Sequence, residues 1–132
     1  MRVRGLVWPL VALLALLAAR RRLDVVEVRG RSMAPALLPG DRLLVMRGPA
    51  RVGDIVLAAD PRDARRELVK RVRSIGPGGV HLAGDNPAES TDARTFGPIP
   101  AHAIRWRVAA RYWPPGRIGA IATSVEGDLD RE

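Results

Sequence analysis

Lysine is almost absent from this chain, so its single lysine is a candidate for chemistry. Of the 22 basic residues, every one except Lys70 is an arginine. Arginine stays charged in any protein, whereas a desolvated lysine can lose its proton and act as a base. We therefore consider Lys70 a candidate general base. The alternative is a lysine without a chemical role on a solvated face.

The residues around Lys70 predict that its side chain is desolvated. The segment 67–75 has the composition of a β-strand, and side chains alternate between the two faces of a strand. Leu68, Lys70 and Val72 then share an apolar face, with Arg71 among the charged residues on the opposite face. Desolvation disfavours an ammonium group and lowers the pKa of a lysine from its ordinary value of about 10.4. A lysine that extends from an edge strand into water is the alternative.

Ser32 is the candidate nucleophile for such a base. It follows a predicted strand at 26–28 and begins a stretch punctuated by proline and glycine. A serine nucleophile needs a base, and a neutral lysine is the general alternative to histidine. His81 follows a glycine-rich turn and His102 sits in a Pro/Ala loop, which suits surface histidines. A serine that only caps a helix or forms a turn is the competing interpretation of Ser32.

Composition narrows the class of protein. A length of 132 residues suits one domain, and the absence of cysteine excludes disulfides and thiolate metal sites. Two histidines are too few for a convincing metal cluster, so we predict no metal and no cofactor. The net charge of +8 permits anionic lipid or nucleic acid as a partner. With one Phe and one Tyr, the chain lacks an aromatic-interleaved basic motif, so we predict no nucleic-acid partner.

The N-terminal residues 1–22 predict a membrane anchor. The uncharged run 5–19 spans about 22 Å as a helix, less than the ~30 Å hydrocarbon core. Arginines on both sides could extend to the headgroups, and the small-residue pattern of a cleaved signal peptide fits poorly at 17–19. We predict a retained, single-pass anchor in the plasma membrane, with the catalytic domain on the extracytoplasmic side. The flanking charges nearly balance and do not decide the orientation.

The remainder of the chain predicts a mainly β fold. Short apolar runs are separated by glycine and proline turns, and apolar residues alternate with arginines from 104 to 112. Such a pattern favours a compact antiparallel β domain over βαβ units. We expect a charged loop at 60–66, a catalytic domain at 23–113 and a flexible C-terminal tail at 114–132.

Three sequence boxes resemble those of type I signal peptidases. The string SMAPALLPGD, which begins at Ser32, resembles their Ser-Met-x-Pro-x-Leu-x-x-Gly-Asp box, and residues 70–72 resemble their lysine box. Residues 84–100 resemble the third box, and all three come in the family's order. The Phe-Gly-Pro-Ile-Pro ending of the third box is similar to that of short members such as the mitochondrial inner-membrane peptidases. The small size also resembles nickel superoxide dismutase maturation proteases of the same family.

The resemblance implies a signal-peptidase-type fold and a serine/lysine dyad. Ser32 would be the nucleophile and Lys70 the general base, while Ser90 matches a serine that orients the lysine amine. Gly30 stands where some members carry a serine that donates to the oxyanion, so the Ser32 backbone N–H and another donor would form the oxyanion hole. The remaining matches line the site, shape the nucleophile loop or form a structural pair: Met33, Pro35, Gly84, Asp85, Asn86, Asp92 and Arg94.

We therefore predict a membrane-anchored serine endopeptidase that cleaves signal or pro-peptides. Its partners would be the lipid bilayer and precursor proteins with small residues at −1 and −3. Three alternatives stay open: a dedicated maturation protease for a single partner such as nickel superoxide dismutase, a self-cleaving serine/lysine protease, and a catalytically dead membrane-tethered binding protein.

Overall fold

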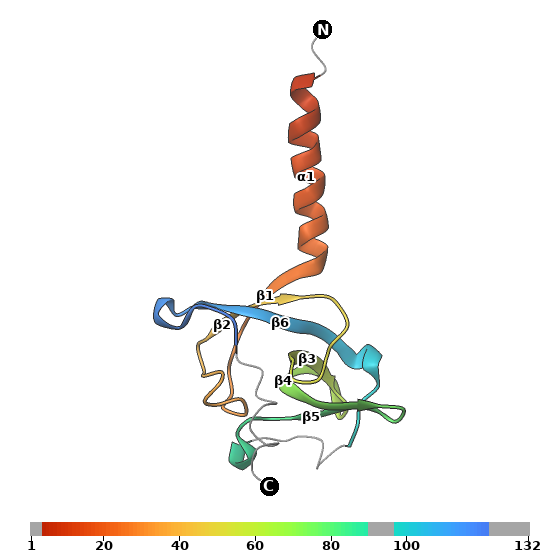
Figure 1. The fold of residues 1–132 in the computed structure, drawn as a ribbon, viewed down its shortest axis with the longest axis vertical. Coiled ribbons are helices and arrows are strands. Elements are labelled where there is room, and N and C mark those ends of the chain that lie inside the picture. Colours follow the sequence, from red (N-terminus) through yellow and green to blue (C-terminus); the bar gives the residue numbers. More distant parts are fainter. Residues whose placement is uncertain (1–3, 90–96, 122–132) are drawn as a thin grey trace.

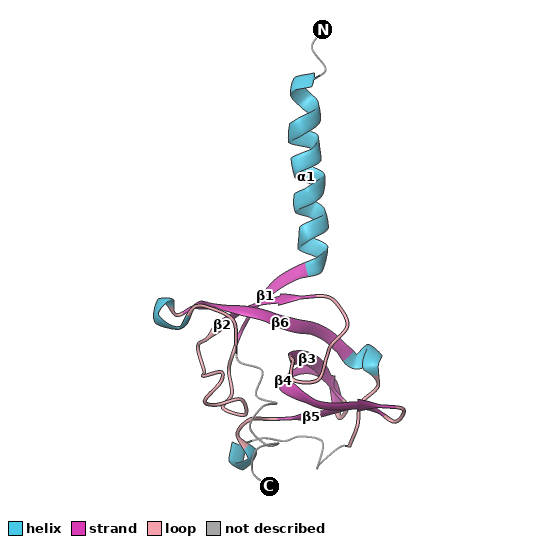
Figure 2. Cartoon of the chain, in the orientation of Figure 1, coloured by secondary structure: helices cyan, strands magenta, loops and turns pink. Residues whose placement is uncertain are grey.

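A single helix leads into a β domain in the computed structural model, which describes residues 4–89 and 97–121 (Figure 1). Helix α1 (Arg4–Arg22) points away from the domain and continues directly into the first strand. The strands are β1 (Leu23–Glu27), β2 (Arg42–Met46), β3 (Ile55–Asp60), β4 (Asp63–Gly76), β5 (Gly79–Ala83) and β6 (Ile104–Trp113). Three short 3-10 turns complete the described elements: η1 (Pro87–Glu89), η2 (Ala101–Ala103) and η3 (Pro115–Arg117) (Figure 2).

The six strands form one antiparallel sheet, which confirms the predicted mainly β fold. Their order is β1-β2-β6-β3-β4-β5. β6, the last strand in the chain, therefore lies between β2 and β3, and it joins the N-terminal pair of strands to the β3–β4–β5 meander. At one edge, β1 pairs only with β2 among the described strands.

β3 is buried on both faces because its sequence, Ile-Val-Leu-Ala-Ala, is a continuous apolar run. Ile55 and Leu57 belong to an apolar cluster that includes Val28, Met33, Leu37, Leu43 and Val45. Val56 and Ala58 belong to a second cluster with Val72, Val80, Leu82 and Ile99. The central strand thus connects the two halves of the core.

The charged segment 60–66 is part of a β-hairpin, so the predicted loop there is wrong. Asp60 ends β3 and pairs with Asp63, where β4 begins. Asp60 is buried and accepts hydrogen bonds from the Arg62 backbone N–H at 2.9 Å and from its guanidinium at 3.0 and 3.1 Å. These bonds hold the pKa of Asp60 below its ordinary value. Pairing with β3 overrides the weak strand preference of the charged residues.

The predicted N-terminal helix is present, but its proposed role as an anchor is not confirmed. No helix within the described part of the chain combines the length and apolarity that crossing a membrane requires. Most of the apolar side chains of α1 are exposed, among them Leu6, Trp8 and Leu14. The C-terminal end of α1 is fixed to the sheet, because the Arg47 N–H donates to the Arg22 carbonyl at 2.9 Å.

Part of the predicted C-terminal tail belongs to the folded domain. Gly119 forms an antiparallel bridge with Arg111 through two backbone hydrogen bonds of 3.0 and 3.1 Å. Ile121 packs against the core cluster that contains Met33. Residues 122–132 lie outside the described part of the chain, so the predicted flexibility is not tested there.

Candidate active site

The loop that carries Ser32 joins β1 to β2 and is closed at its base. The Val28 N–H donates to the Asp41 carbonyl, and the Gly40 N–H donates to the Val28 carbonyl, both at 2.8 Å. Inside the loop, the Leu37 N–H donates to the Met33 carbonyl at 2.9 Å, which forms one helical turn. Residues four apart on such a turn share a face. Both side chains are accordingly buried in the core, and they anchor the loop immediately after the serine.

Ser32 and Lys70 line the same cleft, as the predicted dyad would require. The cleft has a volume of about 630 Å³ and lies between the 26–33 segment and the β3–β4 hairpin. Ser32 is half-buried, whereas the Lys70 side chain is only 3% exposed. Gly30 and Met33 also line the cleft. A second hollow of similar size, about 580 Å³, lies between α1 and β1, but neither Ser32 nor Lys70 lines it.

The predicted burial of Lys70 is confirmed, and Arg71 on the opposite face of the strand is buried as well. Lys70 pairs with the buried Val56 of β3 and lies two residues before the buried Val72. Arg71, on the opposite face, is only 1% exposed. Strand alternation assigns a residue to a face, but it does not reveal whether another segment covers that face.

Arg71 connects three segments around the site. Its Nε and Nη2 donate to the two carboxylate oxygens of Asp85 at 2.9 and 2.8 Å. Its Nη1 donates to the Gly53 carbonyl at 2.8 Å. This bidentate pair fixes the chain after β5 against β4. The sequence offered one signal for it, since Asp85 lies in the third box and Arg71 in the lysine box.

The segment 84–86 lies against the loop that carries Ser32. The Asn86 N–H donates to the Ser32 carbonyl at 2.8 Å, and its side-chain amide donates to the Arg31 carbonyl at 3.2 Å. Gly84, in the same segment, is buried. The structure therefore brings together Ser32, Lys70, Asp85 and Asn86. The Pro35 carbonyl accepts a hydrogen bond from Arg117 at 3.4 Å, and Ser90, Asp92 and Arg94 lie outside the described residues.

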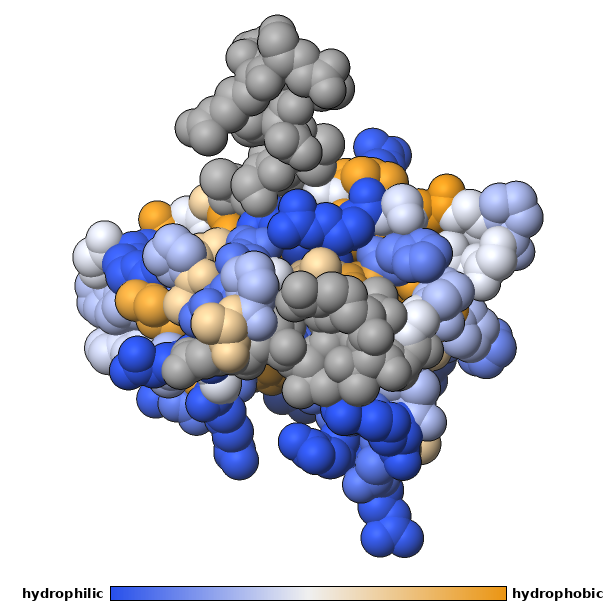
Figure 3. Space-filling view, turned by 90° about the horizontal axis from the view of Figure 1, so that it is seen from below, coloured by the Kyte–Doolittle hydropathy of each residue, from blue (hydrophilic) through white to orange (hydrophobic). Residues whose placement is uncertain are grey.

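The cleft is rich in positive charge. Its lining includes two acidic residues, Glu27 and Glu67, and five exposed arginines: Arg29, Arg31, Arg62, Arg65 and Arg66. Glu67 is in turn paired with Arg105 at 3.3 Å. Hydrophilic residues also cover much of the face of the domain seen in Figure 3. The described residues contain no group of three or more His, Asp or Glu side chains that could hold a metal ion.

Comparison with known proteins establishes the family. Residues 3–81, more than half of the chain, match the family described as "Signal peptidase, peptidase S26". The chain belongs to this family. The predicted resemblance to type I signal peptidases is thereby confirmed, and membership supports a peptidase as the class of enzyme.

Similar members of the peptidase S26 family include three mitochondrial proteins. The mitochondrial ATP-independent inner membrane protease subunit 1a of Arabidopsis thaliana is 32% identical over 127 residues, covering 75% of this chain and 76% of the relative. The mitochondrial inner membrane protease subunit 1 of Schizosaccharomyces pombe is 33% identical over 110 residues, covering 64% and 70%. The subunit 1 of Mus musculus is 37% identical over 95 residues, covering 57% of each chain.

These relatives correct the predicted location. We expected a plasma-membrane protein, whereas the relatives are proteases of the mitochondrial inner membrane. The plasma-membrane prediction is therefore wrong. The physical reason is that basic flanking residues indicate affinity for an anionic lipid surface but do not distinguish one such membrane from another.

Proposed function

We propose that this member of the peptidase S26 family is a serine endopeptidase with Ser32 as nucleophile and Lys70 as general base. The observation that carries the proposal is that both residues line one cleft, where the lysine is buried and the serine is half-buried. Burial disfavours the ammonium form of a lysine and so favours the neutral amine that can accept a proton.

In the proposed reaction, the Lys70 amine takes the proton of Ser32 Oγ while Oγ bonds to the carbonyl carbon of the scissile peptide. The tetrahedral intermediate collapses as the C–N bond breaks, and the Lys70 ammonium gives its proton to the leaving amine. Neutral Lys70 then deprotonates a water molecule, which attacks the ester. As the bond between the acyl carbon and Ser32 Oγ breaks, the Lys70 ammonium returns its proton to Oγ, which releases the acid product and restores the Ser32 hydroxyl and the neutral amine.

The surrounding residues would assist this reaction from fixed positions. The Ser32 backbone N–H is our proposed oxyanion donor, with a second donor from backbone or water, because Gly30 has no side chain to contribute. Ser90 is the proposed partner that orients the Lys70 amine. The Arg71–Asp85 pair and Asn86 would hold the loop so that Oγ keeps its distance from the base.

The proposed substrates are precursor proteins with small residues at −1 and −3. An extended substrate could pair with the edge strand β1 and its continuation into the cleft. The arginines along the cleft favour acidic side chains near the scissile bond. We therefore expect Arg65→Gln combined with Arg66→Gln to raise KM several-fold for an acidic peptide. KM for a neutral peptide of the same length should not change.

We further propose that α1 holds the catalytic domain at a membrane. The exposed apolar side chains of the helix and the arginines at its end, Arg20 to Arg22, support attachment to a lipid surface. The names of the relatives point to the mitochondrial inner membrane as the compartment.

The test of the dyad uses the full chain in detergent and a precursor peptide with alanine at −1 and −3. We expect wild type to cleave and both Ser32→Ala and Lys70→Arg to lose at least 1,000-fold in kcat, roughly the scale of the loss when one catalytic residue is removed. Ser74→Ala, an exposed serine on β4, is the matched control.

A pH–rate profile of the wild type should rise as the lysine loses its proton. Cleavage that survives Lys70→Arg would exclude the neutral-lysine mechanism, since arginine supplies no neutral amine. A wild type that never cleaves would favour the binding-protein alternative.

A further inference from the structure

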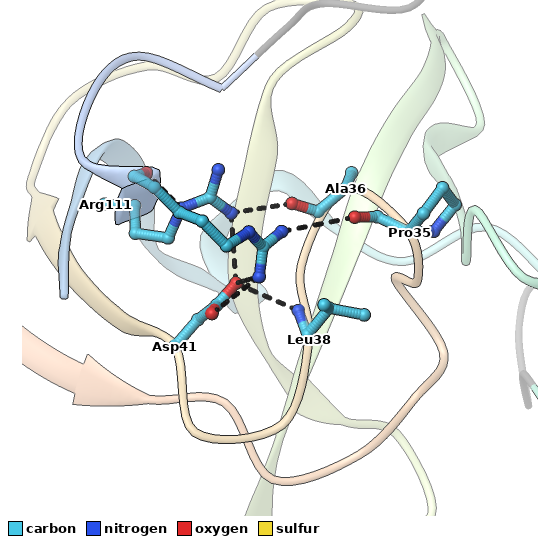
Figure 4. A network of polar contacts seen from close by, with 6 residues as sticks. Pro35, Ala36, Leu38, Asp41 and Arg111 are labelled. Carbon is cyan, nitrogen blue, oxygen red and sulfur yellow. Dashed lines mark hydrogen bonds and ion pairs between the residues drawn. The ribbon is translucent and has the colours of Figure 1, made fainter. Parts of the chain in front are cut away.

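The end of the nucleophile loop opposite Ser32 is held by a buried carboxylate. Asp41 is only 2% exposed, and one of its oxygens accepts the Leu38 N–H at 2.9 Å (Figure 4). Arg111 Nη1 donates to the same oxygen at 3.0 Å. Arg117 Nη1 donates to both oxygens at 2.9 and 3.0 Å. Two guanidinium groups from the C-terminal part of the chain thus share one carboxylate, and we name Asp41, Arg111 and Arg117 the Asp41 clamp.

Both arginines of the Asp41 clamp also bind the backbone of the nucleophile loop. Arg111 Nη1 donates to the Ala36 carbonyl at 2.8 Å, and Arg117 Nη2 donates to the Pro35 carbonyl at 3.4 Å. Arg111 Nε donates to the Arg117 carbonyl at 2.6 Å, so β6 fixes the turn that follows it. The clamp therefore contacts the loop three and four residues after Ser32.

We propose that Asp41, Arg111 and Arg117 are positioning residues for the nucleophile, so that the segment after β6 is required for cleavage. The proposal rests on the proposed role of Ser32. Apart from one helical turn, the loop has no regular structure of its own. It is fixed by Asn86 at Ser32, by the apolar anchors Met33 and Leu37, and by the Asp41 clamp at Pro35, Ala36 and Leu38.

The place of the clamp contacts in the loop supports an effect on the rate of catalysis. Loosening Pro35 and Ala36 frees the helical turn that begins beside Ser32. A displacement of about 1 Å at a reacting atom can cost about 100-fold in rate. Arg111 and Arg117 also lie beyond residues 3–81, the part of the chain that matches the peptidase family. Asp41 ends the first of the three boxes, whereas the two arginines that bind it lie outside all three.

The test compares Arg117→Met and Arg117→Lys with Arg51→Met in the full chain. Arg51 is exposed and does not belong to the Asp41 clamp, so its replacement is the matched control. We expect Arg117→Met to lower kcat at least tenfold with KM within about twofold of wild type. Arg117→Lys should recover part of kcat, because an ammonium still reaches Asp41. A melting temperature well above the assay temperature shows that each variant is folded.

Hydrogen–deuterium exchange measures the loop without relying on activity. The Leu37 and Leu38 amides should exchange faster in Arg117→Met, with amides of β3 unchanged. A folded Arg117→Met with wild-type kcat, or with unchanged exchange at these two amides, would overturn the positioning role. If Ser32→Ala still cleaves, the proposed function fails, and the exchange result alone decides whether the clamp holds the loop.

Discussion

Two buried arginine–carboxylate clusters support the Ser32 loop, and they differ in what surrounds the arginine. In the Arg71–Asp85 pair the guanidinium is almost completely buried and its carboxylate is 13% exposed. In the Asp41 clamp the carboxylate is buried, while the side chains of Arg111 and Arg117 are 12% and 30% exposed. In the first cluster, water cannot replace a lost partner of the arginine. In the second, water can reach at least one of the two arginines.

This difference predicts that removing the two carboxylates lowers the free energy of unfolding by different amounts. A buried ion pair is weak evidence for stability, but leaving one partner buried without the other is expensive. The exposed fraction of the arginine side chain should therefore decide how far the free energy of unfolding falls when its carboxylate is removed. A third pair, Asp60–Arg62 in the β3–β4 hairpin, extends the comparison, since its arginine is 46% exposed.

The largest loss of stability is expected for Asp85→Asn. It leaves the Arg71 guanidinium buried with a neutral amide, so the free energy of unfolding should fall by about 3–5 kcal/mol. Urea unfolding monitored by circular dichroism measures this. Arg71→Met combined with Asp85→Leu should recover part of the loss. A change below about 1 kcal/mol for Asp85→Asn would show that burial of the arginine does not set the cost.

Asp41→Asn should lower the free energy of unfolding less than Asp85→Asn does. Relative to that loss of stability, it should lower the rate of cleavage more. The amide still accepts one hydrogen bond, and Arg117 can turn to water, so we expect a loss of about 1.5–3 kcal/mol. At an assay temperature where the variant is folded, kcat should fall at least tenfold. The same urea series and steady-state kinetics provide the measurement. A larger loss of stability than in Asp85→Asn would reverse the proposed order.

Asp60→Asn should have the smallest effect, and one that depends on pH. Because the hydrogen bonds from Arg62 lower the pKa of Asp60, its contribution is present above the unfolded-state pKa of about 4 and is lost as pH falls through the lower folded value. Urea unfolding between pH 3 and 7 should show wild type and variant converging at acid pH. If the free energy of unfolding of wild type and variant differs by the same amount at every pH in this range, the Asp60–Arg62 ion pair does not contribute to stability.

The local pattern of the sequence was sufficient to predict the strand that carries Lys70 and the burial of its side chain. It was not sufficient for Arg71, because alternation cannot tell a solvated face from one covered by the chain after β5. The charged hairpin at 60–66 was missed for a related reason. Its residues have weak strand preference, and only pairing with the apolar β3 makes them extend.

The residue types can be read from the chain alone: one lysine among arginines, a serine before a Met-x-Pro turn, and three boxes in the order of a peptidase family. Which charged side chains meet depends on the three-dimensional fold. Asp41 and Arg117 are 76 residues apart, and they reach each other because β6 lies between β2 and β3. Side-chain chemistry and strand period are local properties of a chain. Contacts between distant segments depend instead on which strands pair with one another in the sheet.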